Sequence, residues 1–244
     1  MSLFLAGLVV LVTHTLEAIT GFGCTVLGMP FVSALLGVKT AVKSMTVLGW
    51  LLALYFVITK FKNIDFKQFG IIAFFMLLGM PIGMYLFRAQ QNNSLFMMLA
   101  VFIVIVSVVQ LYKLSTQKEE PPALTKKGAI PYYLLLFIGG IVHGIFSSGG
   151  PLVVLYASRT LKDKGTFRAT LCLLWTTLNT ILLSTYLMEG SFTKDVTIKT
   201  GILIPFVILG IYFGEKVHDK VDSKRFSLLV FAMLLITGIF MLVF

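Results

Sequence analysis

The amino-acid sequence predicts an all-α integral membrane protein, a polytopic helical bundle of two inverted repeats, each with a glycine-interrupted hairpin and three spanning helices. Three observations carry this prediction: the composition, the lengths of the apolar blocks, and the distribution of Lys and Arg between the connections. Of 244 residues, 58% are hydrophobic and 12% are charged, and the mean hydropathy is +0.97. A soluble domain has about 25% charged residues, so a water-soluble globule is excluded.

The apolar blocks define the expected helices. They lie at about 3–36, 44–59, 69–87, 95–112, 130–158, 169–188, 200–214 and 226–244. Most are close to the roughly 20 residues that one helix needs to cross about 30 Å of hydrocarbon. The blocks at 3–36 and 130–158 are too long for one crossing and too short for two. Small and polar residues interrupt them at Thr20–Gly23 and Ser147–Pro151, so each block is expected to form a hairpin.

The two halves of the chain repeat each other. A common spacing between corresponding features indicates duplication, and a basic residue followed by a tryptophan is the most specific of them. The spacing is 125 residues for Lys43 and Trp50 against Arg168 and Trp175, and 127 residues for Thr20 and Gly23 against Ser147 and Gly150, and for Gly83 and Tyr85 against Gly210 and Tyr212.

The longest polar stretch divides the chain into domains. It contains Pro121 and Pro122 with charges of both signs, which is typical of a flexible linker. The expected organisation is a first transmembrane repeat at 1–113, a linker at 114–129 and a second transmembrane repeat at 130–244.

The basic residues predict the topology, because Lys and Arg are retained on the cytoplasmic side. The chain has 20 Lys and Arg against 10 Asp and Glu, a formal net charge of +10. If both long blocks are hairpins, 15 cations fall on one side and 5 on the other; if each crosses once, the division is 11 against 9. The hairpins are therefore favoured, in a multi-pass protein of the cell (inner) membrane with both termini outside and the linker cytoplasmic. Topology explains the charge, so a lipid bilayer is the expected partner and nucleic acid is not.

The two interruptions are the first candidate site. Paired, interrupted segments at corresponding positions of inverted repeats are typical of secondary transporters. A helix that begins at such a break presents free N–H groups and the positive end of its dipole, which attracts anions. The alternative is that small residues only let the helices pack closely. The expected substrate-binding residues of the breaks are Thr20, Gly21, Gly23, Ser147, Ser148, Gly149, Gly150 and Pro151.

Lys43 and Arg168 are the second candidate, because each follows its break by about twenty residues. In an inverted pair they would approach a central cavity from opposite sides and hold an anion, with Arg168 able to bind an oxyanion through two hydrogen bonds. Alternatively, both extend to the membrane interface from helix ends. Asn179, among the threonines of the same block, is expected to add to the substrate-binding residues.

His14, Glu17 and His143 are the remaining ionisable groups at membrane depth. His14 and Glu17 lie three residues apart, on one helix face, and can share a proton or a hydrogen bond. Histidine and a buried carboxyl change charge near neutral pH, so the three could couple transport to protons. A satisfied polar pair that braces the hairpin is the alternative. Three histidines and two cysteines in apolar runs do not suggest a metal site, and no cofactor is expected.

Four motifs carry a resemblance to a known family. They are TGFGCTVLGMPF at Thr20–Phe31, VKSMTV at Val42–Val47, GIFSSGGPLVVLY at Gly144–Tyr156 and TFRAT at Thr166–Thr170. With these motifs the chain resembles the sulfite exporter TauE/SafE family of membrane permeases over almost its whole length, although many relatives have a denser run of glycines in the first module. The resemblance implies transport, often outward, of sulfite, sulfoacetate or related anions. It also implies that Gly23, Gly149, Gly150, Pro151 and Arg168 lie near the pathway.

These observations together predict a secondary transporter that moves a small anion, a sulfur oxyanion or an organosulfonate, by alternating access. Export is expected, because an inside-negative potential of 100 mV drives one negative charge outward with about 2.3 kcal/mol. An anion channel is the nearest alternative. An intramembrane enzyme that uses His14, Glu17 and His143 fits less well, because no nucleophile motif accompanies them, and the chain is not expected to be an enzyme. A homo-oligomer is compatible with the sequence.

Overall fold

The computed structural model describes residues 2–116, 127–217, 228, 231–232, 234–236, 238–239 and 242–243. Every regular element in these residues is a helix, which confirms the predicted all-α fold class. Six helices, α1, α3, α4, α5, α8 and α9, are long and apolar enough to cross a membrane. Most of the linker and most of the last apolar block, at 226–244, lie outside the described residues.

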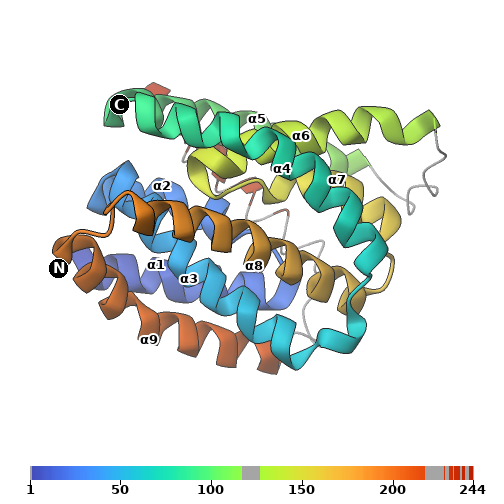
Figure 1. The fold of residues 1–244 in the computed structure, drawn as a ribbon, viewed down its shortest axis with the longest axis horizontal. Coiled ribbons are helices and arrows are strands. Elements are labelled where there is room, and N and C mark those ends of the chain that lie inside the picture. The colour runs from blue at the N-terminus through green and yellow to red at the C-terminus, as the bar shows by residue number, and fades with distance from the viewer. Residues whose placement is uncertain are drawn as a thin grey trace.

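The helices follow the chain in two similar sets (Figure 1). The first set is α1 (Ser2–Thr20), α2 (Cys24–Leu36), α3 (Val38–Thr59), the 3-10 turn η1 (Phe61–Asn63), α4 (Phe66–Ala89) and α5 (Asn92–Thr116). The second is the 3-10 turn η2 (Lys127–Ala129), α6 (Ile130–Phe146), α7 (Gly150–Thr160), α8 (Lys164–Met188) and α9 (Lys194–Val217). Both predicted interruptions separate helices, α1 from α2 and α6 from α7, and are called the first break and the second break below.

Corresponding helices begin at nearly constant spacing. The starts of α1 and α6, and of α4 and α9, are 128 residues apart, and those of α2 and α7, and of α3 and α8, are 126 residues apart. Two helices begin earlier than the apolar blocks predicted, at Val38 instead of about 44 and at Lys164 instead of about 169. The chain turns at Gly37, and the Asp163 side chain caps α8 by accepting from the Thr166 N–H, so polar residues enter the first turn. Lys43 and Arg168 therefore lie in the second turn of their helices rather than at the first residue.

The two sets interlock, because each packs its outer helices against the other. Helix α9 lies along α1, and α6 lies along α4 (Figure 1). Both pairs run parallel and touch through glycines: Gly210 meets His14 of α1, and Gly83 and Gly140 contact backbone atoms of the facing helix. A side chain at the last two positions would collide with backbone, so these glycines set how closely α4 and α6 approach. The two halves thus form one bundle.

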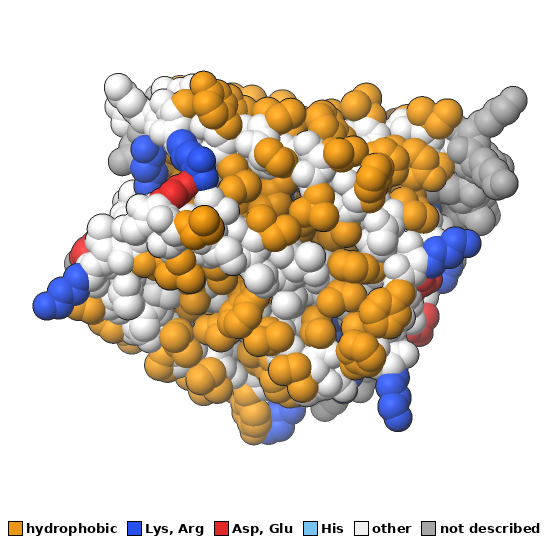
Figure 2. Space-filling view, viewed as in Figure 1, with side chains coloured by type: hydrophobic (Ala, Val, Ile, Leu, Met, Phe, Trp, Pro, Cys, Tyr) orange, Lys and Arg blue, Asp and Glu red, His pale blue; other side chains and the backbone are white. Residues whose placement is uncertain are grey.

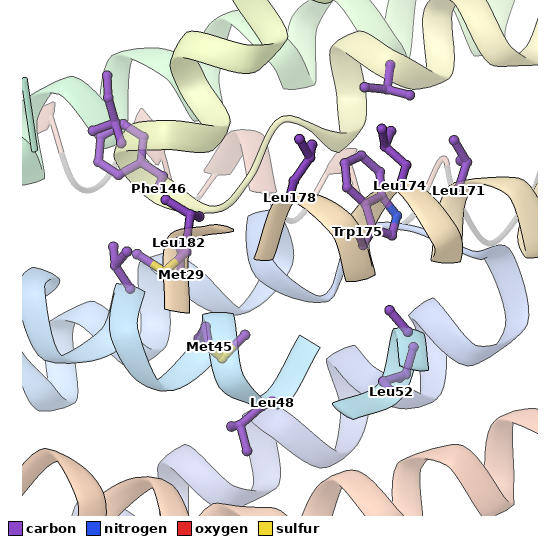
Figure 3. Close-up of a cluster of buried hydrophobic side chains, with 14 of the residues drawn as sticks. Met29, Met45, Leu48, Leu52, Phe146, Leu171, Leu174, Trp175, Leu178 and Leu182 are labelled. Carbon is purple, nitrogen blue, oxygen red and sulfur yellow. The ribbon is translucent and has the colours of Figure 1, made fainter. Parts of the chain in front are cut away.

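Helices α3 and α8 cross antiparallel at the centre. Trp50 Nε1 donates to Thr180 Oγ1 at 2.9 Å, and Lys43 Nζ, one end along, donates to the Ser191 carbonyl at 3.2 Å. Figure 3 shows Met45, Leu48 and Leu52 on α3, and Trp175 and neighbouring leucines on α8. All of these side chains are buried. This crossing forms the centre of the core, and the two breaks lie beside it.

Charged residues lie toward the edges of the molecule, and hydrophobic side chains cover much of the middle of the face in Figure 2. At one end Arg88 pairs with Glu189 and Lys43 reaches Ser191. Asn63 lies beside Gly165 where α3 ends and α8 begins, at the other end of the crossing. The cations that the sequence assigned to the sparser side thus include residues that meet in space, as expected if that side is one face of a membrane protein.

Candidate functional site

A small cavity lies between the two breaks. Its lining comes from the end of α1, the start of α2, α3, the end of α6, the start of α7, and α8. The cavity measures about 20 Å³, room for one or two water molecules. The lining residues are Glu17, Gly23, Thr25, Val26, Gly49, His143, Ser147, Ser148, Gly150, Pro151, Trp175 and Asn179.

The first break is closed by its own side chains. The Cys24 N–H, at the start of α2, donates to Glu17 Oε2 at 2.6 Å. A carboxylate from α1 thus occupies the N-terminus of α2, where the sequence predicted an anion. Thr20 Oγ1 donates to the carbonyls of Leu16 and Phe22, which satisfies the last turn of α1.

Two side chains of α8 hold the first break from outside. Arg168 Nη1 donates to the Ala18 carbonyl at 2.9 Å, and Trp175 Nε1 donates to the Gly21 carbonyl at 3.0 Å. Gly21 has φ +83°, and a Cβ there would lie 2.8 Å from Arg168 Cα. Only glycine fits this position without strain or displacement. The Arg168 guanidinium also lies 4.6 Å from the centre of the Phe56 ring.

The second break is organised around Asn179. Ser147 has left-handed backbone, with φ 54°, and its Oγ donates to Asn179 Oδ1 at 2.8 Å. His143 Nε2 lies 3.1 Å from the same oxygen. A carboxamide oxygen only accepts, so the ring donates from Nε2. The His143 ring stacks on Trp175 with centroids 5.7 Å apart, so Trp175 touches both breaks.

Buried polar atoms at the second break have no partner among the described residues. Ser148 Oγ is one, in a side chain only 3% exposed, and His143 Nδ1 is another. Both residues line the cavity at the start of α7. A buried polar atom without a partner costs about 1–3 kcal/mol, which a guest that supplies the missing hydrogen bond recovers. The second break therefore has unused capacity for a ligand, and the first does not.

The cavity lining contains eight of the predicted site residues and omits six. The eight are Glu17, Gly23, His143, Ser147, Ser148, Gly150, Pro151 and Asn179; the six are His14, Thr20, Gly21, Lys43, Gly149 and Arg168. Of the six, Thr20, Gly21, Gly149 and Arg168 lie at or against a break.

His14 lies apart from the cavity. Its Nδ1 is 2.9 Å from the Val10 carbonyl of the same helix, and its Cβ faces Gly210 of α9. His14 and Glu17 therefore bond to different partners and not to each other in this conformation. Lys43 lies further along α3, held by the Ser191 carbonyl.

Trp175, Thr25, Val26 and Gly49 line the cavity but were not among the residues that the sequence proposed. The tryptophan could have been found, because it matches Trp50 at the spacing of the repeats and a buried indole N–H needs an acceptor. Among the described residues no group of three His, Cys, Asp or Glu side chains could hold a metal ion, and Cys24 and Cys172 are buried free thiols.

Comparison with known proteins gives one match. The model of a family described as sulfite exporter TauE/SafE matches residues 5–241, nearly the whole chain. No curated protein and no solved structure matches. The match spans both breaks and every residue of the cavity lining.

Proposed function

Since this chain belongs to the sulfite exporter TauE/SafE family, we propose that it is a secondary transporter that exports a small sulfur oxyanion or organosulfonate, such as sulfite or sulfoacetate, across the inner membrane. One observation carries the proposal: Ser148 Oγ and His143 Nδ1 are buried without partners where α7 begins. The helix dipole and a hydroxyl donor together favour an anion at that point. The anion docks at the second break.

Alternating access between two inverted repeats is the proposed mechanism. Three features support it: matched helix starts, the antiparallel crossing of α3 and α8, and the exchange of outer helices between the sets. A cavity of about 20 Å³ is too small for an oxyanion of four or more heavy atoms, so the site has to widen before substrate enters. Rocking of one set against the other supplies that opening.

Lys43 and Arg168 act on the anion through their charge in this proposal. Each is held by a backbone carbonyl, near opposite ends of the α3–α8 crossing. A cation at either end of a low-dielectric path lowers the energy of an anion between them without direct contact.

Cotransport with a proton is a second candidate, favoured by Glu17 in the cavity lining. An ionised carboxylate repels an anion in the same cavity, so anion binding favours protonated Glu17. One anion carried with one proton is electroneutral, so its flux follows the pH gradient, whereas an uncoupled anion follows the membrane potential. Flux into proteoliposomes under each gradient alone separates the two, and Glu17→Gln should make a proton-coupled flux independent of the pH gradient.

The test of the proposed function is flux of labelled sulfite and sulfoacetate in proteoliposomes. We expect saturable flux, and about tenfold or greater loss at low substrate in Ser148→Ala, because a hydrogen bond to a charged group contributes about 1.5–3 kcal/mol. Ser107→Ala is the matched control: Ser107 Oγ is also buried without a described partner, but it lies on α5 outside the cavity lining. Equal flux in the two variants contradicts the docking site. Flux that does not saturate indicates a channel.

A further inference from the structure

Corresponding residues of the two sets make different hydrogen bonds. On α8, Arg168 and Trp175 donate to backbone carbonyls of the first break, Ala18 and Gly21. On α3, the matched residues Lys43 and Trp50 donate to Ser191 and Thr180, which belong to the second set but not to its break. The first break is thus clamped by the opposite set, and the second break is not clamped in the corresponding way.

The repeat spacing identifies where the missing clamp would attach. The first and second breaks correspond at 127 residues, Thr20 with Ser147 and Gly23 with Gly150. At that spacing the carbonyls of Ala18 and Gly21 correspond to those of Ile145 and Ser148. Lys43 and Trp50 are the cation and the indole donor on the facing helix, as Arg168 and Trp175 are for the first break.

The two clamps also differ in burial, as expected if one is engaged and the other is released. Arg168 and Trp175 are 7% and 6% exposed. Lys43 and Trp50 are both only partly buried. Trp50 Nε1 is held by a hydroxyl that itself donates to the Thr176 carbonyl, at the exposed edge of α8. Neither of these α3 donors therefore has to be torn from a buried acceptor in order to move.

We propose that Trp175 and Arg168 clamp the first break in the conformation described, and that Trp50 and Lys43 clamp the second break, at the carbonyls of Ser148 and Ile145, in the opposite transport conformation. This proposal rests on the proposed function, because it assigns the described structure to one end of an alternating-access cycle. Four donors on two helices thereby serve both states.

The exchange keeps the two states close in energy. Each clamp gives up an indole and a cation hydrogen bond on one set as the corresponding pair forms on the other, so the number of hydrogen bonds is preserved. A transporter needs states that differ by no more than a few kcal/mol, because substrate can shift the equilibrium only by its differential affinity for them. Clamping Ser148 would also bring the Trp50 indole to the residue whose hydroxyl we assign to the anion, so closure and substrate binding share one residue.

The test measures from which side the cavity is open. A single cysteine is placed in the lining with Thr25→Cys in a Cys24→Ser/Cys172→Ser background. It is then labelled in proteoliposomes with a membrane-impermeant maleimide from each side. The chain has only two tryptophans, so Trp50→Phe and Trp175→Phe are matched controls for each other. Trp175→Phe should shift the ratio of the two labelling rates by about fivefold away from the described state, and Trp50→Phe should shift it about fivefold in the opposite direction.

Opposite signs support the exchange, because a merely structural tryptophan would change stability or yield without reversing the side of access. Shifts in the same direction, or no shift in either variant, overturn it. If Trp175→Phe does not fold, Trp50→Phe and Lys43→Gln remain, and both should favour the described state. Labelling requires no substrate, so reversed labelling without sulfite flux contradicts the proposed function alone, and sulfite flux without reversal contradicts the clamp exchange alone.

Discussion

The two breaks occupy corresponding places in the two halves, yet they are satisfied in opposite ways. At the first, Glu17 accepts the Cys24 N–H, and Arg168 and Trp175 hold the backbone. At the second, the residue that corresponds to Glu17 at a spacing of 126 is His143, and it turns to Asn179. Ser148 Oγ is left without a described partner. The comparison teaches that a repeated motif can supply a closed joint in one copy and a binding site in the other.

The largest expected effect breaks the closed joint. Gly21→Ala combines a left-handed backbone, at about 1–2 kcal/mol, with a collision against Arg168 Cα, at about 1–3 kcal/mol. Gly37→Ala is the matched control, because Gly37 has φ +81° and nothing within 4 Å of the added Cβ. Thermal unfolding in detergent should show a clearly lower midpoint for Gly21→Ala than for Gly37→Ala. Equal midpoints would contradict the tight contact between α8 and the first break.

A smaller effect is expected when the second break loses its organising side chain. Asn179→Leu removes the acceptor of Ser147 Oγ and of His143 Nε2 and should destabilise the protein by about 1–3 kcal/mol. It should also reduce sulfite flux more than stability alone explains. Thr180→Ala, at the next position of α8, removes an exposed hydroxyl and should leave the second break intact. Similar flux in the two variants would show that Asn179 does not position the second break.

The smallest expected effect compares a buried helix cap with an exposed one. Asp163 starts α8 as Glu17 starts α2, but it lies in water, and the Thr166 N–H that it accepts lowers the pKa of its carboxyl. The folded-state pKa is below the unfolded one, so this stabilisation is present above the ordinary carboxyl pKa and is lost as pH falls through the folded value. Asp163→Asn should retain a cap and flatten the acid limb of the unfolding midpoint against pH slightly. An unchanged acid limb would mean that the cap does not contribute.

Much of the fold could be predicted from the sequence, because it depends on local patterns. Apolar block length gave the spanning helices, and small polar residues marked both breaks. The starts of α3 and α8 were predicted too late, since Val38 and Lys164 begin helices whose first turns are polar and are fixed by Gly37 and the Asp163 cap. Hydropathy does not report such caps.

The site could be predicted only in part. Ser147, Ser148, Gly150 and Asn179 line the cavity as expected. That Glu17 would fill the N-terminus of α2 depends on how the chain folds back over seven residues, which residue spacing does not specify. The Arg168 contact with the Ala18 carbonyl joins residues 150 apart in the sequence and depends on the packing of α8 against α1. A single sequence does not reveal which of several carbonyls a buried cation will find.

The central claim is that the second break, and not the first, binds the anion. Equilibrium binding of labelled sulfite to the purified protein in detergent tests it directly, in wild type, Ser148→Ala and Ser107→Ala. We predict saturable binding in wild type and Ser107→Ala, and a dissociation constant about tenfold or more higher in Ser148→Ala. Unchanged affinity in Ser148→Ala would contradict the claim.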